Sequence, residues 1–545
     1  MDLKDQPFNE LDIKINPTDF MDWKNDSNRR EYSGYLMGYM GAEFRMPLTD
    51  TGFRDDRNTQ LLPATALLTP SCNVNYHENG LSKRGGTAIM IAGNGYSGQG
   101  GFQFYTPTKQ VNVFASNGVL YQNSYSNILR SGMSTTNPFS FIQTSKYVFF
   151  ADGQSNPGYW DGSGAAQLVT PAASWSGNMP FQFVTHTKAG SGAGDRLWAV
   201  TPDGLWYSNL NLPTDFLGGD AGFVPIDSIG GLVGAYDLGG QLFAFSRTQT
   251  FLINDTGTIS TWGYNNAIWE GGTASFRLIG KANNNLYFMT EDGLIYNLVG
   301  VLTTGGYNAV PLNRPAFVDK FIRDNVNVQN IYNFHVSYDR KLRALKFFMQ
   351  QGGTGNNIAL TYFIDKSPTS AWIIHSNTNY SSGYNATCSW EVRVTPGNYE
   401  IFTMDSSGNV WGLEQPSRDD NGNPYPVIIN TKAQDLDKPR SNKHWLAMAL
   451  RGDASGTANF TMFMTVEGQA LGATSFTMGG SGATFNSATF NTSTFATNIL
   501  TTAPVPFGFY GRDLELQLIE NEIGVDFFLS EILYMVKPLE IKVGQ

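Results

Sequence analysis

The stretch LWAVTPDGLWYS, from Leu197 to Ser208, carries the pattern that decides the fold class. Two apolar runs rich in strand-forming residues flank a turn formed by Pro202, Asp203 and Gly204, which is the pattern of a β-hairpin. The same shape recurs along the chain, in one case without the glycine: VFASNGVLYQ (Val113 to Gln122), VFFADG (Val148 to Gly153), LFAFSRTQTFLI (Leu242 to Ile253), LYFMTEDGLIYNL (Leu286 to Leu298) and IFTMDSSGNVWGL (Ile401 to Leu413).

The spacing of these hairpins favours a β-propeller. When the hairpin without a glycine is counted, the repeat from Gly118 to Gly293 averages about 44 residues, which suits one four-stranded blade. The interval from Gly293 to Gly408 is about twice as long, which indicates one further hairpin without the pattern. We estimate about six blades and leave five or seven open. A row of β-sandwiches gives similar hairpins, but blades stacked around an axis bury both faces of each sheet and leave only short edges.

The composition agrees with an all-β protein. The 545 residues include 59 glycines, aromatic residues make up 13% and charged residues only 15%, which suits short strands joined by tight turns. This composition excludes a coiled coil and a charge-driven disordered chain. The net charge of −10 lacks the basic footprint of a tight nucleic-acid binder. Two cysteines, Cys72 and Cys388, are too few for a disulfide scaffold or a zinc cluster.

The sequence also bears on where the protein is made. No apolar stretch follows the opening residues Met1 to Asp5, so we expect no secretory signal peptide. No window approaches ~18 uninterrupted apolar residues, so we expect no membrane span. These features predict a protein that is kept in a cytoplasm or built into something assembled there.

We expect three parts: an N-terminal arm over residues 1–45, a propeller over 46–425 and a C-terminal antiparallel β-sandwich over 426–545. The arm is rich in charge and carries Phe20, Met21 and Trp23, which predicts either an arm that packs on a neighbour, in its own chain or another, or a frayed terminus. RDDNGNPYP, from Arg418 to Pro426, crowds turn residues together and marks the second boundary. Beyond it, apolar residues alternate along candidate strands, namely Phe460, Met462, Met464 and Val466, then Leu514, Leu516 and Leu518, then Ile532, Tyr534 and Val536.

Two segments depart from the strand pattern. PAFVDKFIRDN, from Pro315 to Asn325, predicts a short helix between blades because its apolar residues fall at helical spacing: Phe317, Val318, Phe321 and Ile322. A Ser/Thr-rich stretch within the sandwich repeats phenylalanine every five residues, at Phe485, Phe490 and Phe495. It predicts either a loop tucked against the sandwich by its phenylalanines, or a small coil of pentapeptide-like turns or an adhesive aromatic loop.

The sequence leads us to assign no catalytic, cofactor-binding or metal-binding residues. GNGYSG, from Gly93 to Gly98, matches a phosphate-binding pattern, but strand-like runs flank it, which predicts a glycine-rich hairpin loop. Asp419 and Asp420 begin a segment similar to a calcium loop, but its final carboxylate is missing, so we expect a turn. Five histidines are scattered without metal-ligand spacing, which indicates structural or surface roles: His77, His186, His335, His375 and His444.

Carbohydrate chemistry is the main alternative to a structural role. Acidic pairs such as Asp55 and Asp56 are the residue types that a glycosidase uses, and propellers host such enzymes. No sialidase-type S-x-D-x-G-x-T-W box is present in the sequence. Four tryptophans lie in or beside the hairpin runs, and we interpret them as blade packing and not as sugar platforms: Trp160, Trp198, Trp206 and Trp411.

The order of several short motifs resembles that of a known family. GFRDDRNTQLLPATALLTPSCNV begins at Gly52, and NGLSKRGGT, which ends at Thr87, follows it. Next come YWDG (Tyr159 to Gly162), RLWAV and LWYSN (Arg196 to Asn209), Lys443-His444-Trp445 and GRDLELQL (Gly511 to Leu518). In this order, over roughly residues 45–540, the chain resembles the β-propeller tail hub or nozzle proteins of short-tailed bacteriophages, which include the packaged-DNA stabilisation proteins.

The resemblance implies a structural virion protein without enzymatic activity or cofactor. It implies a ring, typically of six copies, below the portal and its adaptor, with tail fibre or tail tip proteins as further neighbours. Such a ring retains packaged double-stranded DNA and lets it pass during ejection without binding it specifically. It implies a location in the virion tail, assembled in the host bacterial cytoplasm. The alternative is a carbohydrate-binding or glycosidase propeller, such as a tail-spike-like protein or a lectin.

Overall fold

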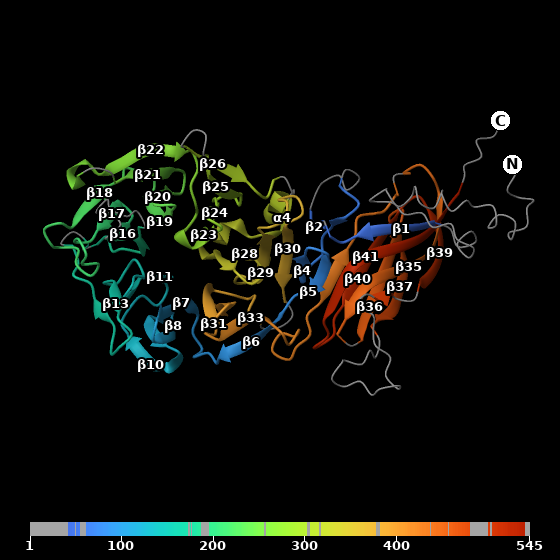
Figure 1. Cartoon of the computed structure of the whole chain (residues 1–545), viewed down its shortest axis with the longest axis horizontal. Coiled ribbons are helices and arrows are strands. Elements are labelled where there is room, and N and C mark those ends of the chain that lie inside the picture. The colour runs from blue at the N-terminus through green and yellow to red at the C-terminus, as the bar shows by residue number, and fades with distance from the viewer. Residues whose placement is uncertain are drawn as a thin grey trace, which may run out of the picture. The chain divides into compact units, whose positions relative to one another are not determined.

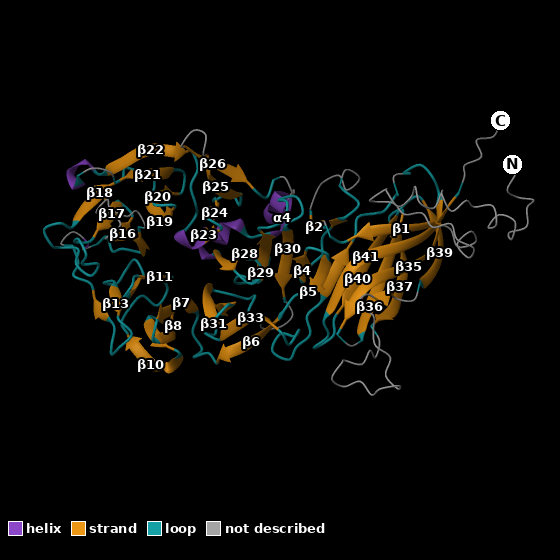
Figure 2. Ribbon diagram, in the orientation of Figure 1, coloured by secondary structure: helices purple, strands orange, loops and turns teal. Residues whose placement is uncertain are grey.

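The computed structural model divides into two compact units. The propeller unit contains residues 86–368 and 376–416, and the sandwich unit contains residues up to 85, residues 369–375 and residues from 417 onward. Nearly all regular structure is β-strand, with few helical turns between strands (Figure 2). No described helix has the length and apolar character to span a membrane. The structure describes residues 42–49, 51–54, 62–172, 175, 177–186, 196–255, 258–301, 306–314, 318–377, 382–436, 438–455, 457–479, 500–501 and 504–539.

The propeller unit is built from antiparallel sheets that follow one another along the chain. The first three are β7–β10 (Gly98–Thr106, Lys109–Ser116, Val119–Gln122, Ser124–Arg130), β11–β14 (Ser140–Gln143, Val148–Ala151, Gly158–Trp160, Gln167–Leu168) and β15–β18 (Gln182–Thr185, Leu197–Thr201, Gly204–Tyr207, Gly222–Pro225). The next two are β19–β22 (Leu232–Leu238, Gln241–Ser246, Thr250–Asn254, Gly263–Trp269) and β23–β26 (Ile279–Ala282, Asn285–Met289, Ile295–Val301, Gly306–Pro311). The last two are β27–β29 (His335–Asp339, Ala344–Met349, Ile358–Phe363) and β31–β33 with β6 (Cys388–Thr395, Asn398–Met404, Val410–Gln415, Gly86–Ile91).

These sheets form a β-propeller. Figure 1 shows them arranged around a common centre, in chain order from blue through green to orange. The innermost strands of the seven sheets are β7, β11, β15, β19, β23, β27 and β31. Neighbouring inner strands contact each other, as β7 does with β31 and β11. The described residues contain seven such sheets, one more than the sequence estimate of about six.

The hairpins read from the sequence are confirmed, and each supplies the second and third strands of one sheet. LWAVTPDGLWYS, for example, forms β16 and β17, with Trp198 opposite Tyr207. The seventh pair is β28 and β29, which lie on either side of the loop from Gln350 to Asn357. Because this loop is long, its hairpin lacks the short Asp-Gly or Asn-Gly turn, which explains the double interval between Gly293 and Gly408.

The first propeller strand in the chain completes the last sheet. β6 pairs antiparallel with β33, with Ala88 opposite Gly412, and Figure 1 shows the blue β6 beside the orange β33. This pairing closes the circle of blades within the chain through backbone hydrogen bonds. It also corrects the interpretation of GNGYSG: β6 and β7 flank this segment but belong to different sheets, so Gly93 to Gly98 connects two blades and is not a hairpin loop. No helix begins there.

The blade cores are apolar layers between adjacent sheets. Between the first two sheets, Phe104, Val113 and Leu120 pack with Phe150 and Trp160, all of them buried. The predicted short helix is confirmed as α4 (Val318–Asn325), whose buried face holds Val318, Phe321 and Ile322. Short 3-10 turns complete the unit: η4 (Ile259–Thr261), η5 (Phe276–Leu278) and η6 (Val328–Asn333).

The sandwich unit has two main sheets. One has the order β38-β35-β41-β5-β4, with β1 also on β41 and β39 also on β35, and the other has the order β34-β40-β36-β37. The strands of the first are β1 (Ala42–Pro47), β4 (Val74–His77), β5 (Gly80–Lys83), β35 (Lys443–Ala454), β38 (Leu500–Thr501), β39 (Val505–Gly511) and β41 (Phe527–Pro538). The strands of the second are β34 (Val427–Asn430), β36 (Ala458–Val466), β37 (Gln469–Met478) and β40 (Leu514–Glu520). The remaining strands are β2 (Gly52–Phe53), β3 (Ala66–Leu67) and β30 (Trp372–Ser376).

The alternation read from the sequence is confirmed in this unit. The alternate residues of β36 and β40 named above are buried, and Phe460 of β36 packs edge-on against Phe527 of β41 with ring centroids 5.1 Å apart. Along β41, burial is not alternating, since Leu533 and Met535 are buried together with Ile532, Tyr534 and Val536.

The unit boundaries differ from those expected from the sequence. The expected propeller began at residue 46, but the propeller unit begins at Gly86, and it ends at Pro416 instead of 425. The reason is pairing across the whole chain: β1 lies antiparallel to β41, with Ala42 opposite Val536, and β5 pairs with β41 beside it. Most of the expected arm over residues 1–45 lies outside the described residues, as do Asp55, Asp56, Phe317 and the repeat of Phe485, Phe490 and Phe495.

Candidate functional site

The inner strands of the propeller surround a central cavity of about 170 Å³. All seven sheets contribute lining residues from their inner strands, from β7 through Gly101 to β31 through Ser389, and η5 contributes Arg277 shortly before β23. Gly101 is required by close packing, because a Cβ there would lie 2.3 Å from the Trp390 ring. The side chains with hydrogen-bonding or titratable groups at this cavity are Gln99, Ser140, Gln182, Tyr236, Arg277, His335, Cys388 and Ser389.

Arg277, His335 and Cys388 form the chemical centre of this cavity. The Arg277 guanidinium donates to the backbone oxygen of Thr387 through Nη2, which also lies 3.3 Å from Nδ1 of His335. Burial and the Arg277 charge hold the pKa of His335 well below its usual value, with partial opposition from the Asn333 carbonyl. Burial likewise lowers the pKa of Arg277 and raises the pKa of the Cys388 thiol to about 12. His335 is therefore a neutral imidazole at neutral pH, and Cys388 is a thiol and not a nucleophilic thiolate.

Three glutamines join neighbouring inner strands by paired hydrogen bonds, and we call these contacts glutamine bridges. The Gln182 amide donates to the Ala235 oxygen at 3.0 Å and accepts from the Ala235 nitrogen at 2.9 Å. Gln103 makes the same pair of contacts with the backbone of Arg393, and Gln143 makes it with the backbone of Tyr105. Each side-chain amide thus bonds to the backbone of the neighbouring inner strand as a paired β-strand residue would, although the two strands belong to different sheets. These contacts fix the position of one blade relative to the next.

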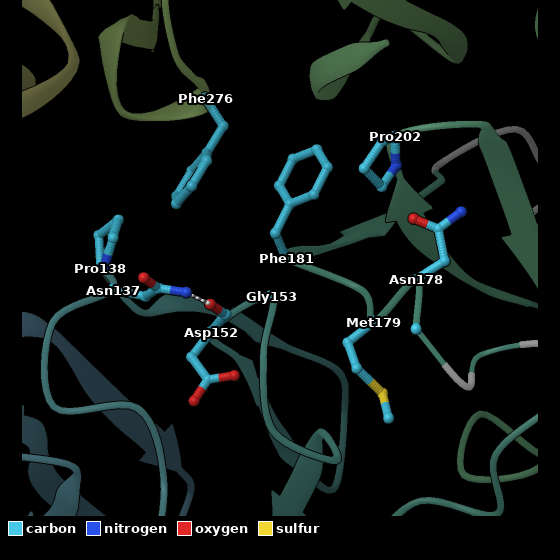
Figure 3. A pocket seen from close by; sticks show the side chains of 10 residues that line it. Asn137, Pro138, Asp152, Gly153, Asn178, Met179, Phe181, Pro202 and Phe276 are labelled. Carbon is cyan, nitrogen blue, oxygen red and sulfur yellow. Dashed lines mark hydrogen bonds between the residues drawn. The ribbon is translucent and has the colours of Figure 1, made fainter.

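A second cavity of about 360 Å³ lies in the same unit (Figure 3). Phe181 and Phe276 stand over it in Figure 3, and their ring centroids are 5.9 Å apart. Asp152 is its one ionisable lining residue. The Asp152 carboxylate already accepts backbone N–H groups from Ser134, Gln154 and Ser155. This cavity therefore offers aromatic surface but not the pair of available carboxylates that a glycosidase needs.

His186 lies buried between two carboxylates. Its Nδ1 is 2.6 Å from Oδ2 of Asp237 on β19, and its Nε2 contacts Asp255, which follows β21. Burial alone would lower the pKa of His186, but the hydrogen bonds to Asp237 and Asp255 outweigh it and raise the pKa above its usual value. The imidazolium thus links the third sheet to the fourth as a buried ionic contact.

Two buried cations organise the sandwich unit. Arg84 forms a bidentate ion pair with Asp420, at 3.0 Å and 2.7 Å, and neither side chain is exposed. The neighbouring Lys83 is equally buried and lies 2.9 Å from Glu520. Lys83 and Arg84 belong to the NGLSKRGGT motif, and Asp420 belongs to RDDNGNPYP. The Asp420 carboxylate is thus committed to Arg84, and the expected turn is present, since the Asp419 carboxylate accepts the Gly422 N–H.

The other residues singled out from the sequence occupy structural positions. His375 is fully buried against the backbone oxygen of Val74, His77 contacts Ser82, and His444 stacks on Tyr510. Both cysteines are free and buried. Among the described residues, no group of His, Cys, Asp or Glu side chains is arranged as a metal-ligand set. The four tryptophans serve blade packing: Trp160 and Trp198 are buried in apolar clusters, and Trp206 is partly buried and stacks on Phe223. Trp411 is buried, and its Nε1 donates to the Asp405 carboxylate.

The outermost strands of the propeller sheets are nearly free of charge. Arg130 is the one charged residue among β6, β10, β14, β18, β22 and β26, all of which lie at a sheet edge. Several of these strands expose large aliphatic side chains: Ile89, Met90, Ile128, Leu168 and Val310. Exposed edge strands usually carry charges that prevent association, so this surface lacks the usual protection.

Comparison with known proteins does not identify a family for this chain. No protein-family model matches the chain, and no curated protein matches its sequence. Similar solved structures include YCF48 bound to D1 peptide (10% identity, TM-score 0.37) and the N-terminal domain of Nup159 (9% identity, TM-score 0.35). Each match covers 61% of this chain, and the two cover 99% and 94% of those chains. The extracellular domain of the putative hybrid two component system BT4673 from B. thetaiotaomicron is also similar (9% identity, TM-score 0.37), over 61% of this chain and 39% of that chain. At these values we draw no functional argument from the similarities.

Proposed function

We propose that this chain is a structural protein of a short-tailed bacteriophage tail, a nozzle or hub subunit that forms a ring below the portal and adaptor. In this role the ring retains packaged DNA and lets it pass during ejection, with no catalysis by the chain. The proposal begins from the motif order, which resembles that of tail hub proteins.

The observation that carries the proposal is the uncharged outer edge of the propeller. Ile128 of β10 is 60% exposed and Leu168 of β14 is 52% exposed, on strands whose edges carry little charge. Such edges invite pairing or packing with another chain, and the cores of protein interfaces are depleted of charged residues. A chain that works only within a ring of copies would have these edges covered.

The charge of the chain supports the second half of the proposal. Basic linings hold DNA because phosphate binding releases counterions. A chain with net charge −10 and only 36 lysines and arginines among 545 residues suits a channel through which DNA slides. A structure of the assembled ring with a basic channel wall would contradict this part of the proposal.

The first test is the mass of the purified full chain by light scattering, with negative-stain images of the same fraction. A ring of several copies, typically six in the family resembled, with a central hole supports the proposal. The paired substitution Ile128→Lys and Leu168→Lys should shift the population toward monomer. Thr248→Lys, in the exposed turn between β20 and β21, is the matched control and should leave the ring intact.

A monodisperse monomer requires a second step before the proposal is abandoned. The monomer is mixed with phage adaptor and portal complexes, and ring assembly on them is measured by sedimentation. A monomer that fails to assemble and instead binds oligosaccharides would favour the alternative of a carbohydrate-binding propeller.

A further inference from the structure

The central cavity of the propeller holds a cation that no described carboxylate neutralises. Arg277 uses Nη2 for its contacts with Thr387 and His335, and neither its Nε nor its Nη1 group donates a hydrogen bond to the described residues. Among these residues, none of the aspartates or glutamates lies within ion-pair distance of the guanidinium. Arg277 is partly buried, and a charge withdrawn from water is costly unless it is paired, which favours an anion beside this guanidinium.

His335 presents a second unused donor to the same cavity. Since Nδ1 faces a guanidinium that can only donate, the neutral imidazole carries its proton on Nε2. The ring is held in place by stacking on Phe348, with centroids 4.6 Å apart. The residue is 3% exposed, and although the Asn333 carbonyl acts on the ring, Nε2 makes no hydrogen bond of regular length and angle among the described residues. Buried polar atoms of this kind normally have a partner, which points to a ligand or an ordered water.

Ser140, on another blade, also has a buried polar atom without a hydrogen-bond partner among the described residues. This atom is its hydroxyl, on β11, and the residue lines the cavity. The cavity of about 170 Å³ is lined by the inner strands, is partly open to solvent and is too small for a folded partner. It has room for a small molecule with a few waters, since one water occupies about 30 Å³ of liquid volume.

We propose that the central cavity of the propeller binds a small oxyanion, a carboxylate or phosphate-type group, through the free N–H groups of Arg277. The Nε2–H of His335 and the hydroxyl of Ser140 are the further donors at the site. A guanidinium offers a planar pair of N–H groups that matches two oxygens of a carboxylate or phosphate, which favours an oxyanion over a halide. This site is independent of the proposed role in a phage tail, because it lies inside one chain.

The test is isothermal titration calorimetry of the full chain with inorganic phosphate and, separately, with malonate, at constant ionic strength in chloride. We expect saturable binding of at least one of the two anions with one site per chain. Arg277→Gln should weaken it at least tenfold. Arg340→Gln is the matched control, because Arg340 is an exposed arginine of the same unit, paired with Glu391, and its loss should leave the affinity unchanged.

The two anions distinguish the source of the oxyanion, since a phosphate-type site prefers phosphate and a carboxylate site prefers malonate. Absence of binding by the wild-type chain, or equal affinity in Arg277→Gln, would overturn the proposal. If Arg277→Gln does not fold, an experimental map of the wild-type protein in the better anion decides: density for an anion beside Arg277 supports the site, and water alone overturns it.

Discussion

Arg84 and Asp420 are separated by 336 positions in the sequence, yet their side chains form a bidentate ion pair that is fully buried. Arg84 also donates to Oδ1 of Asn73 at 2.9 Å, and its guanidinium lies 3.6 Å from the centre of the Tyr425 ring. The pair therefore has the additional hydrogen bonds that a buried charge requires. It connects the segment before the propeller in the chain to the segment after it, both of which belong to the sandwich unit.

We expect Asp420→Ala to lower the free energy of unfolding by about 3–5 kcal/mol, because it leaves the Arg84 charge buried without its partner. Arg343→Ala is the control, since Arg343 and Asp365 form a pair whose side chains are 53% and 54% exposed. Its loss should be much smaller, because ion pairs between exposed side chains contribute little to stability. Urea denaturation followed by tryptophan fluorescence measures both values. Equal losses in the two variants would show that burial of the Arg84 pair contributes nothing special.

The glutamine bridges should contribute to stability according to their burial. Gln182→Ala removes both partners of the buried Ala235 backbone groups, so we expect a loss of about 1–3 kcal/mol. Gln143 is only partly buried, and water can replace its amide, so Gln143→Ala should cost less. Chemical denaturation of the two variants checks the ranking. A larger loss for Gln143→Ala would contradict the role assigned to burial.

The titration of His186 should reflect its two carboxylate partners. In the wild-type chain, NMR of labelled histidine should give a midpoint above the usual value of about 6.5. Asp237→Asn should lower that midpoint, whereas Asp161→Asn at an exposed site should not. Because the folded pKa is raised, the stability from protonated His186 is fully present below about pH 6.5 and is lost as pH rises through the raised pKa. A wild-type midpoint below 6.5 would contradict the ionic contact.

Both thiols should be unreactive in the native protein. Burial raises the pKa of Cys72 and of Cys388 to about 12, so the thiolate fraction at pH 8 is far below that of a free cysteine. We expect a thiol-specific chromogenic reagent to label neither residue until denaturant is added, and then to label both. Rapid labelling of one thiol without denaturant would show that its surroundings open in the native state.

Local sequence patterns predicted the strands well where the physical cause is local. A hairpin such as Leu197 to Ser208 can be identified because its turn needs particular residues and its strands need apolar runs. The same reasoning identified the buried alternation of Phe460, Met462 and Met464. It underestimated the blade count, since the hairpin of β28 and β29 has a long glycine-rich loop instead of a short turn.

The candidate site could not be predicted in this way. Arg277, His335 and Ser140 are separated by tens to nearly two hundred residues, and none belongs to a motif with recognisable spacing. His335 was identified in the sequence only as one of five scattered histidines. Its unused Nε2 becomes apparent only when the inner strands of different blades line one cavity.

The sequence by itself determined the all-β class, the hairpins, the short helix and the sandwich strands, because turn chemistry and the two-residue period of a strand act over a few residues. Only the tertiary structure decided that β6 completes the last blade, that residues before Gly86 join the C-terminal sandwich, and that Asp420 pairs with Arg84. These choices depend on burial and on the neutralisation of charge between segments hundreds of residues apart. No local pattern encodes them, since a strand edge or a buried cation fixes its partner only when the whole chain packs.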